Sequence, residues 1–163
     1  MIKLQKIRQF FFTAIVKRHA AKVGEECRVN YYSQVTGYTY LADHVNFNGM
    51  RIAGIGKVEI GNYFHSGREC MIITSNHNYE GAAIPYDSTY IAKDVKIGDF
   101  VWLGNRVMIL PGVTIGEGAI IQAGAVVVND IPSCAIAGGN PAKVFKYRDK
   151  EHFNSLKNAM KFH

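Results

Sequence analysis

An aliphatic side chain returns at every sixth position between Ile91 and Pro132, through seven hexapeptides without a break. The aliphatic positions are Ile91, Ile97, Leu103, Ile109, Ile115, Ile121 and Val127. A smaller apolar residue follows each of them by four positions: Val95, Val101, Val107, Val113, Ala119, Ala125 and Ile131. A period of six matches neither the period of a helix, about 3.6 residues, nor the alternation of a single strand. It is typical of a parallel β-helix, in which each coil stacks on the one before.

Three such hexapeptides would complete one triangular coil, with the aliphatic side chain on the axis and the smaller one beside it. A weaker repeat also runs backward along the chain, where Val23, Val29, Val35, Leu41 and Phe47 hold the period. Arg51 interrupts the small-residue position, and the frame then shifts by one residue and continues from Gly54. We therefore expect a single all-β domain, a β-helix of about five coils over residues 23–148.

The repeat is interrupted once. The frame would restart at Asn78 but resumes only at Ile91, so residues 78–90 are expected to leave the solenoid as one loop. A long loop inside a regular solenoid is more often functional than accidental. His77 stands at the root of this loop, where a neutral imidazole can serve as a general base. A surface or structural role is the alternative for this histidine, since the chain contains six.

Each end of the chain indicates a helix. Residues 1–22 place basic side chains around the apolar stretch Phe10–Val16, which is too short to span a membrane. We expect an amphipathic helix that caps the open end of the solenoid, with peripheral membrane contact as the alternative. At the other end, Asp149 can cap a helix within residues 149–163. The apolar face of that second helix would hold Phe153, Leu156 and Met160.

The formal net charge of +6 suggests an anionic partner, either a phosphorylated cofactor or a membrane surface. No basic and aromatic motif of a nucleic-acid-binding module occurs, so we expect no nucleic-acid partner. The three cysteines, Cys27, Cys70 and Cys134, are an odd and sparse set, which favours buried, reduced thiols in a cytoplasmic protein.

Four stretches of the chain resemble the left-handed β-helix acyltransferases, the hexapeptide-repeat enzymes that include maltose, galactoside and serine acetyltransferases. They are IGNYFHSGRECMIITSNHNY, VKIGDFVWLGNRVMILPGVTIGEGAIIQAGAVVVNDIP, AGGNPAKV and the loop between His77 and Ile91. The pairing of IGDFVWLG with PGVTIG and GGNPAKV makes the resemblance specific, because hexapeptides alone occur in other β-helices. The run His-Asn-Tyr followed by IPYD is most similar to O-acetyltransferases that modify bacterial surface polysaccharides.

The resemblance implies a catalytic base at His77, which would deprotonate an acceptor hydroxyl for direct attack on acetyl-CoA without an acyl-enzyme. Asn48 lies near the position of an active-site asparagine in the family. The frame shift makes Asn46 a rival, and either asparagine could instead stack within the solenoid. The loop side chains expected to contact the acceptor are Tyr79, Glu80 and Asp87. The two carboxylates among them could instead orient His77 or remain solvated.

Acetyl-CoA is the cofactor that the resemblance implies. Trp102, the only tryptophan, would line its pantetheine arm, or would pack as an ordinary surface aromatic. Lys143 and Lys146 match basic positions that neutralise the phosphates of the cofactor. Small side chains allow family backbones to bond the pantetheine amides, and the matching positions here are Gly104, Asn105, Ala123 and Gly124.

The same fold also hosts a zinc-dependent carbonic anhydrase with three histidine ligands. His44, His65 and His77 are enough in number but lack the ligand spacing of that class, so we expect no metal. A catalytically silent β-helix scaffold is a further alternative.

The resemblance favours an O-acetyltransferase acting on a sugar hydroxyl of a bacterial surface polysaccharide or its precursor. The runner-up is an N-acetyltransferase of a nucleotide-linked amino sugar. The amino terminus does not match the longer helical segment of galactoside and maltose acetyltransferases, which argues against a free disaccharide acceptor. The resemblance also implies a homotrimer with active sites between subunits. We expect a cytoplasmic location, with the inner face of the membrane as a candidate site.

Overall fold

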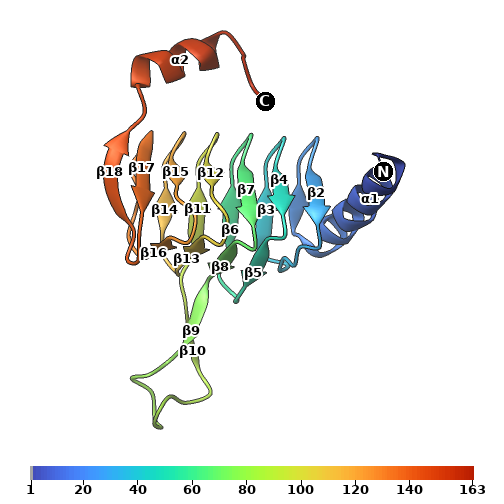
Figure 1. Cartoon of the computed structure of the whole chain (residues 1–163). Helices are drawn as coiled ribbons and strands as arrows, with labels where there is room; N and C mark the ends of the chain where they lie inside the picture. The colour runs from blue at the N-terminus through green and yellow to red at the C-terminus, as the bar shows by residue number, and fades with distance from the viewer. Residues whose placement is uncertain (1) are drawn as a thin grey trace.

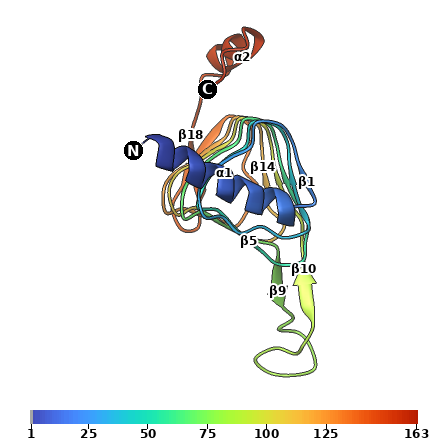
Figure 2. The same cartoon turned by 90° about the vertical axis from the view of Figure 1, so that its right-hand side faces the viewer.

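The hexapeptide pattern produces a solenoid, because each aliphatic position lies beside the equivalent position one coil later, as Ile97 does beside Ile115. The computed structural model describes residues 2–163 and shows three parallel sheets that form the faces of a triangular prism (Figures 1 and 2). Seen from the amino-terminal end, the chain passes from face to face anticlockwise as it recedes, so the β-helix is left-handed (Figure 2).

We name the three faces A, B and C in the order in which the chain visits them. Face A consists of β1 (Lys22–Val23), β3 (Thr39–Leu41), β6 (Val58–Ile60), β11 (Val95–Ile97) and β14 (Thr114–Ile115). Face B consists of β2 (Arg28–Tyr31), β4 (Asn46–Asn48), β7 (His65–Arg68), β12 (Trp102–Leu103), β15 (Ile120–Ile121) and β17 (Ala135–Gly138). Face C consists of β5 (Arg51–Ala53), β8 (Met71–Ile73), β13 (Met108–Ile109) and β16 (Val126–Val127). The last strand, β18 (Lys143–Tyr147), adds to face B antiparallel to β17.

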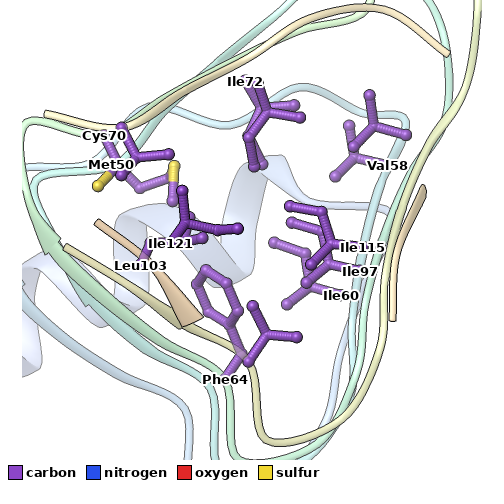
Figure 3. Packing of buried hydrophobic residues seen from close by; sticks show 14 of the residues in the cluster. Met50, Val58, Ile60, Phe64, Cys70, Ile72, Ile97, Leu103, Ile115 and Ile121 are labelled. Carbon is purple, nitrogen blue, oxygen red and sulfur yellow. The ribbon is translucent and has the colours of Figure 1, made fainter. Parts of the chain in front are cut away.

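Aliphatic side chains fill the axis of the prism, as the repeat predicts. The residues expected there are all at most 2% exposed: Ile97, Leu103, Ile109, Ile115 and Ile121. Figure 3 shows such side chains gathered inside the three faces. Cys27 and Cys70 occupy the neighbouring small-residue positions as buried free thiols. Burial raises the pKa of the Cys27 thiol to about 11, so it stays protonated.

The expectation of about five coils is wrong by one, because face B contains six stacked parallel strands. The additional coil begins where the strong repeat ends: Ile131 bridges to Ile115, and β17 then pairs with β15. Ala135 and Ala137 fill the interior of this coil. Their side chains are too small to stand out in a periodic pattern of aliphatic residues.

The frame shift has a local cause in a shortened corner. Gly49 adopts a φ of +89°, and Met50 then occupies the buried position that Arg51 would take if the period were kept. Ile52 follows on the axis, paired with Ile72 on face C, while Arg51 points outward. The repeat therefore continues through this corner with one residue fewer.

The loop is longer at both ends than residues 78–90. It leaves the solenoid after Thr74 and returns at Lys93, whose backbone N–H donates to the Thr74 carbonyl. Its two arms are β9 (Ser75–His77) and β10 (Tyr90–Ala92), which pair antiparallel and project away from the prism (Figure 1). Ile91 belongs to this arm and is 38% exposed, so the assignment of Ile91 to the axis is wrong.

The helix α1 (Ile2–His19) covers the amino-terminal end of the solenoid as expected, and its Val16 is fully buried against the core (Figure 1). The helix also exposes Phe10 and Phe11 on another face. No helix within residues 2–163 is long and apolar enough to cross a membrane.

The second helix, α2 (Lys150–Asn158), follows β18 and begins as predicted. The Asp149 side chain accepts a hydrogen bond from the His152 N–H at 2.9 Å, which caps the first turn. Phe153 and Leu156 are half-buried, whereas Met160 lies beyond the helix and is 77% exposed.

Close stacking at the corners gives a direct test of the fold. A Cβ at Gly98 would lie 2.7 Å from the backbone nitrogen of Glu117 in the next coil, whereas one at Gly37 would meet nothing within 4 Å. Gly98→Ala is therefore expected to lower the free energy of unfolding by about 1–3 kcal/mol, and Gly37→Ala to change it by less than about 0.5 kcal/mol. Urea denaturation of both variants measures the difference, and equal stabilities would contradict the stacking of these corners.

Candidate active site

The imidazole of His77 is held by aromatic side chains of its own loop. The ring stacks on Tyr86 with centroids 3.8 Å apart and an interplanar angle of 16°, and Tyr90 lies 4.5 Å away on the opposite arm. Tyr90 is also the β-pairing partner of His77, so the register of β9 and β10 determines this contact. Stacking at this distance fixes the plane of the imidazole.

The two ring nitrogens of His77 have different surroundings. The Nδ1 atom is buried and has no hydrogen-bond partner among the described residues, whereas Nε2 is not buried. A buried, unpaired nitrogen is rare in native structures and asks for an explanation. Nε2 is therefore the ring nitrogen that can exchange a proton with a bound molecule.

Neither loop carboxylate hydrogen-bonds to His77. Asp87 accepts hydrogen bonds from the Thr89 hydroxyl, at 2.5 Å, and from the backbone N–H groups of Ala82 and Thr89. These bonds, the hydroxyl first, hold the pKa of Asp87 below its usual range. Glu80 is exposed and its backbone N–H donates to the Asn78 side chain. Asp87 thus organises the loop, while Glu80 and the exposed Tyr79 point into solvent with room to meet an acceptor.

The two candidate asparagines belong to a polar ladder on face B. Asn48 donates to the Ser66 carbonyl at 2.7 Å and accepts from Asn30, whose amide also donates to Asn46. Gln9 of α1 donates to Asn30 and connects this ladder to the amino-terminal helix. The side-chain amides of Asn46 and Asn48 therefore form hydrogen bonds between neighbouring coils on face B.

A straight row of outward side chains crosses face B along the solenoid axis. Strand pairing places Trp102 between His65 and Ile120, and continues the row through Ile136 to Lys146. Trp102 is 51% exposed, and the two isoleucines are partly exposed. The row forms an apolar track that ends in a cation, which suits a linear molecule with an anionic end.

The remaining cofactor candidates line the corner between faces B and C, beside this row. Asn105 is engaged by the solenoid, since its side-chain oxygen accepts from the Arg68 N–H at 2.8 Å and its carbonyl accepts from the Gly124 N–H. Gly104 allows close stacking, because a Cβ there would lie 2.5 Å from the backbone nitrogen of Ala123. Lys143, exposed at the start of β18, pairs with Gly138 at the end of the same corner.

The carboxyl-terminal segment folds back over the other side of face B. Phe162 packs on Tyr63 and Phe100 with ring centroids 4.6 and 5.1 Å away, and α2 adds Phe153. A cavity of about 460 Å³ lies between this segment and the face, and Trp102 is part of its lining. His65 lines it too, and burial, with His163 nearby, lowers the pKa of His65.

The structure does not bring His77 and Trp102 together within one chain. The loop leaves the corner between faces C and A, and face B is the side of the triangle opposite that corner. Figure 2 shows the loop and α2 on opposite sides of the prism. His44 and His65 also lie on the α2 side, where both line one groove, far around the coil from His77.

Several features escaped the sequence reasoning. Tyr86 and Tyr90 follow His77 by nine and thirteen positions, and only the antiparallel arms reveal that their rings reach it. The two tyrosines were a usable signal, since Tyr86 lies within IPYD and Tyr90 follows it closely. No local pattern predicted that Phe162 would return to Tyr63.

These features define a left-handed β-helix with a histidine loop at one corner and an apolar track on the facing side. The family model "Bacterial transferase hexapeptide (six repeats)" matches residues 94–129. A maltose O-acetyltransferase from Clostridium difficile 630 is 32% identical, with a TM-score of 0.63 over 78% of this chain and 67% of that one. A galactoside acetyltransferase in complex with coenzyme A is 25% identical, with a TM-score of 0.69 over 86% and 72% of the two chains.

Curated sequences give the same family over a shorter stretch. A Staphylococcus aureus (strain MRSA252) protein named "Putative acetyltransferase SAR2635" is 52% identical over 60 residues, which are 37% of this chain and 30% of that protein. The matches span less than half the length of this and the next two curated relatives. The chain belongs to the hexapeptide-repeat acyltransferases, as the sequence motifs predicted.

Proposed function

We propose that this protein is an acetyl-CoA-dependent O-acetyltransferase acting on a sugar hydroxyl of a bacterial surface polysaccharide or its precursor. The observation that carries the proposal is the half-buried His77 ring, stacked on Tyr86 with its Nδ1 atom buried, in a member of an acyltransferase family. The likeness to a maltose O-acetyltransferase supports a sugar hydroxyl as the acceptor.

In the proposed acetyl transfer, Nε2 of His77 acts as the general base. Nε2 of His77 accepts the proton of the acceptor hydroxyl while the hydroxyl oxygen attacks the thioester carbonyl of acetyl-CoA. The tetrahedral intermediate collapses with loss of the coenzyme A thiolate, which takes the proton back from the imidazolium. The products are an acetyl ester and coenzyme A. No acyl-enzyme forms, so the buried thiols of Cys27, Cys70 and Cys134 have no part in the reaction.

Face B supplies the cofactor wall in this proposal. The pantetheine arm of acetyl-CoA lies along the row from Trp102 through Ile120 and Ile136, and its phosphates face Lys146 and Lys143. Backbone groups at the neighbouring corner bond the pantetheine amides. The positions concerned are Gly104, Asn105, Ala123 and Gly124. The related galactoside acetyltransferase in complex with coenzyme A supports this choice of cofactor.

A homotrimer completes the site. In this proposal the loop of one subunit meets face B of its neighbour, since the loop and face B lie on different sides of a single chain. A contact between two different surfaces closes into a ring under cyclic symmetry, and a threefold ring suits a triangular prism.

An acceptor screen tests the reaction. The purified chain is incubated with acetyl-CoA and with nucleotide-linked sugars, lipid-linked sugars or de-O-acetylated polysaccharide, and thiol release is measured. We expect release with a hydroxyl acceptor and a product ester that mild base removes. A base-stable amide would instead identify the amino-sugar N-acetyltransferase, and no release with any acceptor would contradict an acetyltransferase.

The phosphate contacts give a separate test of the cofactor wall. Replacing Lys143 and Lys146 with Ala is expected to weaken binding of acetyl-CoA roughly tenfold and binding of its 3′-dephospho analogue less. Added salt should weaken wild-type binding in the same direction, since both lysines are exposed. Calorimetric titration measures these affinities, with Arg51→Ala on face C as the control. Equal losses for both cofactors would show that these lysines do not contact the 3′-phosphate.

A further inference from the structure

The helix α1 has two apolar faces, and only one of them is covered by the protein. On the inner face, Val16 is fully buried and Phe12 packs against the core. The Thr13 hydroxyl accepts a hydrogen bond from the Val29 N–H at 3.1 Å, which fixes the rotation of the helix on β2. The outer face carries large apolar side chains that remain 75, 61, 78 and 63% exposed: Leu4, Ile7, Phe10 and Phe11.

These four side chains form one stripe. Spacings of three and four positions place residues on the same side of a helix, so Leu4, Ile7 and Phe11 line up with Phe10 beside them. The stripe points away from the solenoid, because Phe12 and Val16 occupy the inner face. We call this set of four residues the outer stripe. Contiguous exposed apolar patches on soluble proteins mark interaction surfaces.

Cations flank the outer stripe, and the sequence of α1 contains no acidic residue. The helix contains five Lys and Arg residues and no Asp or Glu: Lys3, Lys6, Arg8, Lys17 and Arg18. At about 100° per residue, Arg8 flanks one edge of the stripe and Lys6 and Lys17 flank the other, while Arg18 extends its carboxyl-terminal end. The partner that fits has an apolar interior beneath a negatively charged surface.

We propose that the outer stripe binds the surface of a membrane that contains anionic lipids. The helix lies flat, with the four apolar side chains inserted below the headgroups and the flanking cations against the lipid phosphates. Each cation near such a surface contributes attraction of its own, and the apolar insertion adds to it. A helix of eighteen residues that cannot span the bilayer is suited to this interfacial position.

The position of α1 orients the whole molecule. The helix lies across the amino-terminal end of the prism (Figure 2), so the solenoid stands on the membrane on this end and the histidine loop points sideways. In the proposed trimer the three copies of α1 face the same side and bind together, which strengthens attachment. That last consequence rests on the proposed function, whereas lipid binding by α1 does not.

Vesicle binding of the full chain tests the proposal without any measurement of acetyl transfer. We expect wild-type protein to sediment with phosphatidylcholine vesicles that contain phosphatidylglycerol, and to bind roughly tenfold less to phosphatidylcholine alone. The double variant Ile7→Ser/Phe11→Ser should lose binding roughly 10- to 100-fold. Its control, Ile55→Ser/Ile84→Ser, removes exposed apolar side chains outside α1 and should bind like wild type.

A variant and a matched control test the electrostatic contribution to lipid binding. Lys6→Gln/Lys17→Gln should weaken binding to the anionic vesicles and reduce its dependence on salt, whereas Arg51→Gln/Lys96→Gln should not. Far-ultraviolet circular dichroism and thermal unfolding confirm that each variant is folded. Equal binding of stripe and control variants, or no binding to anionic vesicles, would overturn the proposal. So would a stripe-dependent increase in oligomeric mass in solution, since the occupant would then be a second copy of this chain.

Discussion

His77→Ala is expected to lower the turnover of acetyl transfer about 10²- to 10⁴-fold, because the acceptor hydroxyl loses its general base. Acetyl-CoA should bind the variant with nearly unchanged affinity, since the cofactor wall lies on face B and not at the loop. Steady-state kinetics with the authentic acceptor give the first quantity and calorimetric titration gives the second.

The control for this variant is His152→Ala, which removes an exposed imidazole from α2. Its turnover should equal that of the wild type. A His77→Ala protein that keeps near wild-type turnover would exclude His77 as the base. If the His77→Ala protein were folded but no longer bound acetyl-CoA, the loop would instead contact the cofactor.

Mixing two inactive variants is expected to restore activity. One variant lacks the base, His77→Ala, and the other carries Trp102→Asp on face B, so neither homotrimer contains an intact site. If each site joins the loop of one subunit to face B of its neighbour, about one quarter of the sites in randomly mixed trimers are intact. Activity of co-refolded mixtures, measured against each variant alone, checks this expectation.

Two comparisons make the mixing experiment decisive. Co-refolding His77→Ala with His77→Gln chains should restore nothing, because no mixture of these chains contains the base. Mixtures of the His77 and Trp102 variants that stay inactive, although mass analysis shows mixed trimers, would contradict a shared site. A monomer with full activity in solution would contradict it as well.

The periodic part of the chain was predictable because its signal is local and repeated. The positions of Ile97, Leu103 and Ile109 on the axis follow from a period of six, and each coil tests the same pattern again. The loop was predictable for the same reason, as a gap in that pattern. Its true ends were not, because Ile91 continues the period while pairing with Asn76 outside the prism. An aliphatic residue that keeps the period of six can lie either on the axis of the solenoid or in an arm of the loop, and the sequence pattern does not distinguish the two.

Hydrogen-bonding roles were harder to predict than burial. Asn48 matched a family position, yet its amide is engaged by the Ser66 carbonyl and by Asn30. Asp87 was predicted to contact the acceptor, and the sequence did not reveal that its carboxylate also accepts hydrogen bonds from Thr89 within the loop. Each of these hydrogen bonds joins groups whose separation depends on the geometry of a corner or a turn. The residue types alone do not specify that geometry.

The sequence by itself determined the solenoid, its axis, the presence of one loop beside His77 and the family, because hexapeptide stacking depends on residues at fixed short spacings. Only the tertiary structure decided which side chains meet across coils and arms. It stacked Tyr86 on His77, aligned Trp102 with Lys146 across the strands of face B, and left one apolar side of α1 uncovered. Those relations depend on the register between strands and on the rotation of a helix, which are set by packing between residues far apart in the chain.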